Sequence, residues 1–150
     1  MARLDPRNVR FHPANFRAAL WALRTARRTR RKQARGGLDP ALAPPPPPPL
    51  PATSVRGVRA VLRRLGETCL VNAIVLQAWE AAHGRRRDLI IGATGPQEFG
   101  AHAWLDGDPI IPASDDDLLS SGEPGSNGEV RTFSELLRRP APVYERAASG

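Results

Sequence analysis

Apolar residues recur at helical spacing near the start of the chain, which predicts a first helix. The apolar positions follow i, i+4 and i+7, with a tryptophan beside them: Phe16, Leu20, Leu23 and Trp21. The pattern begins near Pro13 and runs into the almost purely polar stretch RTARRTRRKQAR, up to the glycine pair at 36–37. Its apolar face is too small to form a domain alone. We therefore expect its first turns to dock on the main domain or on a partner.

Two further helices are predicted in the middle of the chain. The first is amphipathic, with apolar positions at Val55, Val58, Leu62 and Leu65, and Gly66 is expected to end it. The second covers ETCLVNAIVLQAWEAAHG, where Thr68 is a plausible N-cap and Gly84 stands where a terminating glycine belongs. Glu67 adds negative charge at the positive end of this helix. Because this helix is apolar on nearly every side, we expect it to be buried.

Short apolar runs in the second half predict strands. The run 89–93 is rich in β-formers, FGAHAWL reads as the next strand, and Asp106–Gly107 is a two-residue hairpin signal. The residues PIIP at 109–112 are expected to return antiparallel, which pairs His102 with Ile111. The segment RTFSELLRRPAPVYERAA predicts a short helical or extended piece and a last strand. Helices first and a small antiparallel sheet after them define an α+β domain.

Six consecutive prolines separate the first helix from the rest of the chain. Such a run adopts polyproline II and is expected to act as a semi-rigid spacer outside the core. The sequence therefore predicts a basic helical arm at 1–35, a proline-rich linker at 36–54 and a globular domain at 55–146. On this division, residues 1–50 are expected to be dispensable for the fold of the domain but not for full activity.

The charge of the chain is concentrated in the predicted arm. Residues 1–35 hold eleven Arg or Lys against one acid, Asp5, whereas the rest of the chain holds eleven bases against fourteen acids. Such an arm could bind nucleic acid, a membrane surface or an acidic partner, or could be a solvated Arg-rich helix. No aromatic interleaving or fold signature supports nucleic-acid binding, so we do not expect a nucleic-acid partner.

The chain contains no apolar run long enough to span a bilayer, and its start has no apolar signal region. One cysteine cannot form an internal disulfide. We therefore expect a cytoplasmic protein without a membrane span.

Candidate chemistry centres on Cys69 and His102. Cys69 falls at about the first position of the buried helix, where free N–H groups and the helix dipole stabilise a thiolate and an oxyanion. His102 lies on the second predicted strand. Taken alone, each residue is more often structural than catalytic. Together they follow the order in which papain-like and transglutaminase-like folds assemble a Cys–His pair.

A metal centre is not expected from these residues. His12 lies across the linker and His83 at the far end of the buried helix, so Cys69 and His102 lack further ligands. We expect no cofactor.

Three stretches, CLVNAIVLQAWEAAHG, DLIIGATG and FGAHAWLDGDP, resemble the transglutaminase-like cysteine proteases of lasso-peptide biosynthesis, the microcin-processing family. The later FSELLRRPAP also resembles the ending of actinobacterial members. The resemblance covers about residues 55 to 144. It implies removal of the leader from a ribosomally made precursor peptide. It also implies two partner proteins, a leader-recognition protein that delivers the precursor and a cyclase that closes the macrolactam ring.

The resemblance assigns Cys69 as the nucleophile and His102 as the general base and acid. In the family an acid follows the histidine by about a dozen residues on the return strand. Here the residues expected opposite and beside His102 carry no carboxylate, which leaves Asp115, just beyond that strand, and Asp106 in the turn. Asp115 is the better candidate by sequence distance, and Asp106 can be explained by turn chemistry.

Two functions remain open from the sequence. One is a leader peptidase that works through an acyl-thioenzyme, favoured by the presence of both Cys69 and His102. The other is a non-catalytic transglutaminase-like module that docks a peptide or partner. It is favoured because no carboxylate is expected opposite or beside His102 on the return strand.

Overall fold

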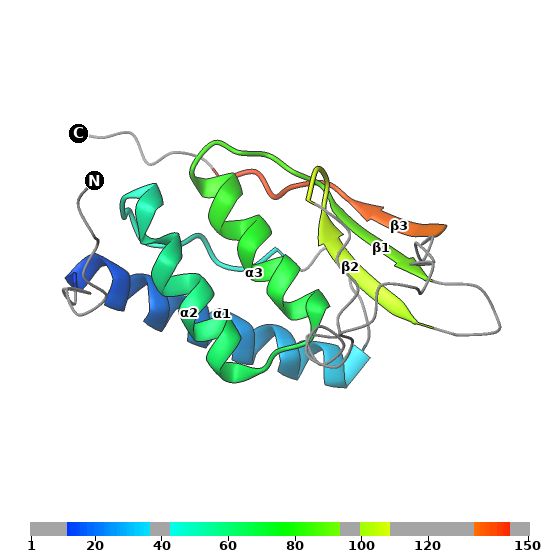
Figure 1. Cartoon of the computed structure of the whole chain (residues 1–150), viewed down its shortest axis with the longest axis horizontal. Helices are drawn as coiled ribbons and strands as arrows, with labels where there is room; N and C mark the ends of the chain where they lie inside the picture. Colours follow the sequence, from blue (N-terminus) through cyan, green and yellow to red (C-terminus); the bar gives the residue numbers. More distant parts are fainter. Residues whose placement is uncertain (1–11, 37–42, 94–99, 109–133, 145–150) are drawn as a thin grey trace, which may run out of the picture.

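The computed structural model of the chain describes residues 12–36, 43–93, 100–108 and 134–144. Within these residues, helices gather on one side and an antiparallel sheet on the other (Figure 1). The elements in chain order are α1 (Pro13–Gly36), the short 3-10 helix η1 (Ala52–Ser54), α2 (Val55–Leu65), α3 (Cys69–Ala82), β1 (Leu89–Ala93), β2 (Ala101–Leu105) and β3 (Ser134–Arg139). This arrangement confirms the expected combination of helices with a small antiparallel sheet.

The ends of the helices follow the local signals in the sequence. Gly66 ends α2 in the left-handed region at φ 57°, and Gly84 follows α3 at φ 82°. Thr68 is the N-cap of α3, and its Oγ1 accepts a hydrogen bond from the Val71 amide at 3.4 Å. The predicted boundaries of both helices are confirmed because each is fixed by residues next to it.

The sheet has the strand order β2-β1-β3, and both pairings are antiparallel. Along β1, Leu89 pairs with Leu105 and Gly92 with His102. The other pairing, with β3, is interrupted between Ile91 and Gly92. The expected return strand at 109–112 lies outside the described residues.

One face of the sheet is covered by α3, which is buried along most of its length, as its apolar sequence predicts. The residues that form this helix–sheet core are Ala73, Ile74, Leu89, Ala103 and Leu105, with Cys69, Leu70, Leu76 and Ile91 packed against them. Burial of these side chains is the main force that holds the helix on the sheet.

A second core lies among the three helices, and it includes α1. Its buried residues are Ala18, Trp21, Ala22, Ala26, Val58, Leu62, Val71, Val75, Ala78 and Trp79. The rings of Trp21 and Trp79 pack with their centroids 5.7 Å apart. The first helix therefore docks on the main domain, one of the two expected outcomes.

The face by which α1 docks differs from the predicted stripe of large residues. Phe16, placed on that stripe, is 62% exposed, whereas the buried face consists mainly of small residues one turn apart. Small side chains allow α1 and α2 to approach closely: a Cβ at Gly57 would collide with the carbonyl of Asn15. The predicted stripe was wrong because the close approach of α1 and α2 selects small residues for the contact surface and leaves the large Phe16 outside it.

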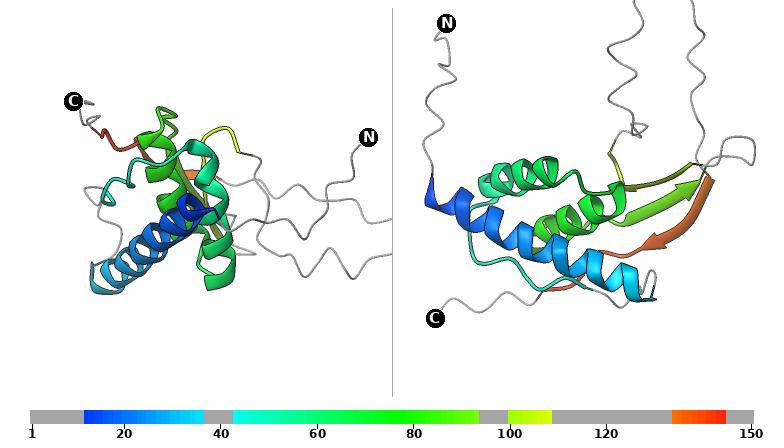
Figure 2. Two further views of the ribbon diagram at one scale, coloured as in Figure 1. Left: turned by 90° about the vertical axis from the view of Figure 1, so that its left-hand side faces the viewer. Right: turned by 90° about the horizontal axis from the view of Figure 1, so that it is seen from below.

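The polyproline segment, residues 44–50, also packs on the domain, contrary to its expected role as a spacer. Figure 2 shows it running alongside the helices before α2 begins. Pro44 is buried and accepts a hydrogen bond from the Tyr144 hydroxyl at 2.8 Å, and Pro45 accepts one from Trp21 Nε1 at 3.3 Å. Farther along, the Leu50 carbonyl lies 2.8 Å from Nε2 of His83. Polyproline II leaves its carbonyls unpaired, so they are available to these side chains.

These contacts do not fit the expectation that residues 1–50 are dispensable for folding. The side chains of α1 supply part of a shared core, and the burial around Tyr144 raises the pKa of its phenol to about 12.

None of the described helices is long and apolar enough to cross a membrane.

Candidate functional site

Cys69 is the first residue of α3, directly after the N-cap Thr68. Its thiol is free and partly exposed, and its side chain packs against the helix–sheet core. The first amides of a helix have no partners within the helix, and they point toward any group at its start. An anionic sulfur or oxyanion at this position would face those amides and the positive end of the dipole.

Glu67 connects the start of α3 to α1. Its side chain is only 3% exposed, and its Oε1 lies 3.4 Å from Nη1 of Arg30 on α1. The main-chain oxygen of Glu67 accepts a hydrogen bond from Nδ2 of Asn72 at 3.3 Å. These contacts connect α1 to the turn that positions Cys69.

His102 lies on β2, opposite Gly92 of β1. Its ring stacks on Trp104 with centroids 5.9 Å apart and an interplanar angle of 16°. Burial lowers the pKa of His102 below its ordinary value of 6.5, so the ring is neutral at pH 7. A neutral imidazole is the form that can accept a proton from a thiol.

The helix that carries Cys69 runs beside the strand that carries His102 (Figure 1). Arg87 connects Glu80, near the end of α3, to the Leu105 carbonyl at the end of β2, through contacts of 3.3 Å each. Helix and strand therefore run in the same direction. Counting back from this contact, Cys69 lies about 16 Å along the helix and His102 about 10 Å along the strand. The two residues thus lie toward the same end of the helix–sheet layer.

The side chains of Cys69 and His102 leave this layer on different faces. Ala103 and Leu105 pack against α3, and side chains alternate along a strand, so His102 and Trp104 lie on the other face. Gly92 lies on the same face as Trp104, because a Cβ there would lie 2.7 Å from the Trp104 ring. The structure brings the two elements together, and the pairing of Sγ with the imidazole stays a prediction.

Asp106 is engaged elsewhere and is not placed to orient His102. Its carboxylate lies 3.1 Å from Nη1 of Arg138, which also contacts Asp88 and Glu135. Asp106 is four residues beyond His102, about 13 Å along the strand, with Trp104 between them on the same face. Asp115, the preferred third residue, lies outside the described residues.

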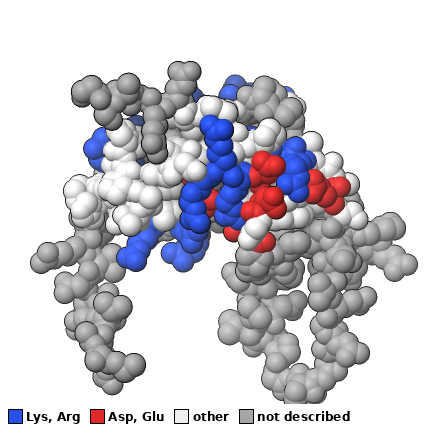
Figure 3. Space-filling model, turned by 90° about the horizontal axis from the view of Figure 1, so that it is seen from above, with Lys and Arg blue, Asp and Glu red and all other residues white. Residues whose placement is uncertain are grey.

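Two arginines that the sequence did not single out hold this end of the sheet together. Arg87 donates from Nε to the Asp106 carbonyl at 2.7 Å and from Nη2 to Asp108 at 2.6 Å. Arg138 crosses from β3 to the carboxylates at the ends of β1 and β2. Seen from above, acidic side chains are flanked by basic ones (Figure 3). The corresponding signals in the sequence are RRRD at 85–88, DGD at 106–108 and the arginine pair at 138–139.

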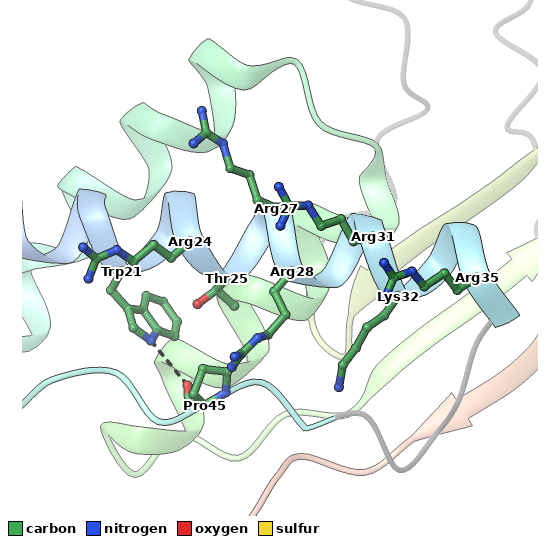
Figure 4. Close-up of a pocket in the computed structure, with 9 residues that line it drawn as sticks. All are labelled: Trp21, Arg24, Thr25, Arg27, Arg28, Arg31, Lys32, Arg35 and Pro45. Atoms are coloured by element: carbon green, nitrogen blue, oxygen red, sulfur yellow. Dashed lines mark hydrogen bonds between the residues drawn. The ribbon is translucent and has the colours of Figure 1, made fainter.

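A separate groove of about 670 Å³ lies between α1 and the polyproline segment (Figure 4). We call it the basic groove, and its lining residues are Trp21, Arg24, Thr25, Arg27, Arg28, Arg31, Lys32, Arg35 and Pro45. The sequence signal was the charge of the predicted arm, but the second wall arises from the folding back of the prolines. Thr25 is 2% exposed, and its Oγ1 has no hydrogen-bond partner among the described residues.

No group of three or more His, Cys, Asp or Glu side chains that could hold a metal ion occurs within the described ranges. His83, one of the histidines considered for such a group, places its ring nitrogens 2.7 and 2.8 Å from the carbonyls of Trp79 and Leu50. It therefore connects the end of α3 to the polyproline segment.

Comparison with protein families matches residues 16–121 to the model of the transglutaminase-like superfamily. The match begins inside α1 and includes α2, α3, β1 and β2, so the first helix lies within the family domain. Searches of curated proteins and of solved structures gave no match. On the extent of the family match, which covers more than two thirds of the sequence, the chain belongs to the transglutaminase-like superfamily.

Proposed function

We propose that the protein is a cysteine peptidase that removes the leader from a ribosomally made precursor peptide during lasso-peptide maturation. The superfamily includes cysteine peptidases. The finer role rests on the resemblance of the Cys-headed helix and the AHAW strand to the microcin-processing family. The observation that carries the proposal is the position of Cys69 at the start of a capped, buried helix that runs beside the His102 strand.

In the proposed reaction, Cys69 and His102 act as nucleophile and general base. The reaction requires the His102 ring to reach Cys69 from the sheet face opposite α3. The imidazole then takes the thiol proton, and the sulfur attacks the carbonyl carbon of the scissile bond. The first amides of α3 stabilise the resulting oxyanion. His102 then gives its proton to the leaving amine as the C–N bond breaks, and water hydrolyses the thioester to a carboxylate and regenerates the thiol. Asp115 is proposed to orient the imidazole.

The proposed partners follow from the same resemblance. A leader-recognition protein delivers the precursor, and a macrolactam cyclase uses the released core peptide. Because the proposed precursor is made on ribosomes, we propose a cytoplasmic location for the peptidase. The proposed chemistry needs no cofactor, because the thiol and the imidazole supply the nucleophile and the proton transfers.

The test is cleavage of the cognate precursor, with its recognition protein present, followed by mass spectrometry. Cys69→Ala should abolish cleavage while leaving the fold intact, because a small thiol is replaced by a methyl group. His102→Ala should be nearly as damaging, because a pair that acts as a unit gives non-additive losses. Undiminished cleavage by Cys69→Ala would remove the thiol mechanism.

A second candidate function is a non-catalytic module that binds a peptide or partner. It is favoured by the placement of His102 on the sheet face opposite α3, away from the side on which Cys69 packs. Equal binding of the precursor by the wild type and by Cys69→Ala, with cleavage by neither, would establish this function instead.

A further inference from the structure

The basic groove gathers six cations that have no part in the proposed thiol chemistry. All six are exposed, and they lie at helical spacing along one side of α1: Arg24, Arg27, Arg28, Arg31, Lys32 and Arg35. Within the described part of the chain, the ion pair made by α1 is that of Arg30 with Glu67, and Arg30 does not line the groove. Among the described residues, no acidic side chain forms an ion pair with these six cations. We propose that the basic groove docks an extended, acid-rich segment of a partner protein.

The spacing of the cations fits an extended peptide. Residues four apart on a helix are separated by about 6 Å along its axis, and the row from Arg24 to Arg35 spans about 16 Å. In an extended chain every second side chain lies on the same face, about 6.6 Å apart. Alternate carboxylates of a bound segment would therefore meet successive turns of α1.

The chemistry of the lining favours carboxylates. Five of the six cations are arginines, whose planar guanidinium groups bind carboxylates through two parallel hydrogen bonds. Trp21 and Pro45 give the groove an apolar wall beside the charged row, as Figure 4 shows. A groove that combines these features can hold both the acidic side chains and the intervening apolar ones of a single strand.

The same lining is poorly suited to nucleic acid or to a membrane. Single-stranded nucleic acid is held by exposed aromatic rings on which bases stack. Trp21, the aromatic residue of the groove, is only 9% exposed and donates its Nε1–H to Pro45. Entry of α1 into a DNA major groove is blocked on one flank by the polyproline segment. A membrane surface is flat and would not fill a hollow of about 670 Å³.

The groove is separate from the thiol. Arg30 contacts Glu67, two residues before Cys69, and so marks the flank of α1 that faces the start of α3. Arg28 is two positions away from Arg30, about 200° around the helix, and it lines the groove. The side of the groove that holds Arg28 therefore faces away from the flank of α1 that contacts Glu67, whereas Arg27, three positions before Arg30, lies nearer to that flank. Cys69 is not among the lining residues, so we expect a segment docked beside Arg28 to leave the thiol uncovered.

The experiment measures binding of a fluorescein-labelled octapeptide of alternating Glu and Ala to the full chain by fluorescence anisotropy, with the Gln–Ala peptide as its neutral counterpart. The groove variant is Arg24→Glu/Arg28→Glu. The matched control is Arg59→Glu/Arg63→Glu on α2, which has the same spacing, exposure and change of charge outside the groove. Thermal unfolding of both variants verifies that each is folded.

We expect the groove variant to lose about tenfold or more in affinity for the acidic peptide, and the control to lose less than about twofold. Equal losses in both variants, or equal binding of the neutral peptide, would overturn a specific groove. A twelve-residue oligo-dT, or vesicles containing phosphatidylserine, could bind more tightly than the acidic peptide with the same dependence on the groove arginines. That result would show that the groove binds this ligand and not an acidic peptide.

A second readout tests the separation from the thiol independently of catalysis. The rate at which iodoacetamide alkylates Cys69 should not change when the groove is saturated with the acidic peptide. Protection of Cys69 by the peptide would overturn the proposal that the groove is a separate docking site. Neither readout requires the chain to be a peptidase, so failure of the groove and failure of the proposed function can be told apart.

Discussion

Trp21 on α1 and Trp79 on α3 pack ring against ring, with their centroids 5.7 Å apart and their planes at 53°. This contact makes the basic helix part of the domain that carries Cys69. It also positions Nε1 of Trp21 to donate a hydrogen bond to the Pro45 carbonyl, so Trp21 also holds the polyproline segment in place. The site and the basic groove therefore depend on one shared core.

Trp21→Ala should destabilise the domain strongly. The side chain is 9% exposed, and its removal leaves a cavity beside Trp79, which typically costs about 3–5 kcal/mol. The free energy of unfolding, measured in urea by circular dichroism, tests the expected loss. Phe16→Ala on the same helix is the control, because its ring is 62% exposed and should change stability by less than about 0.5 kcal/mol.

A truncated chain that begins at residue 52 tests the same core by removing α1 and the polyproline segment. It lacks the alanine face of α1 and the buried Pro44, so it should unfold without a cooperative transition or remain insoluble. An unchanged melting temperature for this chain would show that α1 does not complete the core.

Gly92→Ala should perturb the His102 face of the sheet. The added Cβ would lie 2.7 Å from the Trp104 ring and 3.0 Å from the Ser134 carbonyl, so Trp104 must move from its place beside His102. Overpacking of this kind costs about 1–3 kcal/mol. The checks are the unfolding free energy and the change in total tryptophan emission. Gly36→Ala is the control, since no atom lies within 4 Å of its Cβ position.

Thr25→Val should stabilise the protein. Thr25 is 2% exposed, and its Oγ1 finds no partner among the described residues, so the hydroxyl carries a desolvation cost without a hydrogen bond in return. Replacing it by a methyl group should raise the free energy of unfolding by about 1–2 kcal/mol. The melting temperature provides the measurement. A decrease in stability would mean that the hydroxyl has a partner in solution.

The stability of the protein should depend on pH through His102. Its folded pKa is lowered by burial, so below the unfolded value of 6.5 the unfolded chain binds the proton more readily than the folded one. The contribution to stability is present above pH 6.5 and is lost as the pH falls toward the folded pKa. His102→Gln should flatten this part of the profile, and an NMR titration of the ring protons should give a pKa below 6.5. A raised pKa would instead indicate an imidazolium held by an anionic neighbour.

The sequence predicted the elements well where the signals were local. Gly66, Thr68 and Gly84 act on their own backbone or on the next turn, so the ends of α2 and α3 could be assigned from residue type. The docking of α1 could not, because it depends on small residues and on the approach of Asn15 to Gly57 from a distant helix. The fold-back of the prolines likewise depends on partners far along the chain, such as Tyr144.

The candidate site shows the same limit. Cys69 and His102 could be selected by motif, but the face on which His102 lies depends on which side of the sheet α3 covers. The sequence AHAWL contained part of this information, because small or aliphatic residues alternate in it with His102 and Trp104. Of the first set, Ala103 and Leu105 form the face that packs on α3. The partner of Asp106 could not be predicted, because Arg138 reaches it from a strand thirty-two residues later.

The two candidate aspartates should differ in their effect on catalysis. Asp106 is bound to Arg138 about 13 Å along the strand from His102, so Asp106→Asn should lower kcat/KM for the precursor by less than about threefold. It should lower stability only slightly, because the ion pair is exposed. Asp115→Asn should lower kcat far more if its carboxylate orients the imidazole, as the resemblance implies, and should leave KM nearly unchanged. Precursor cleavage by both variants, with Asp108→Asn as a further control in the turn, measures the difference. A larger loss for Asp106→Asn than for Asp115→Asn would reverse the assignment and would require His102 to pair along its own strand.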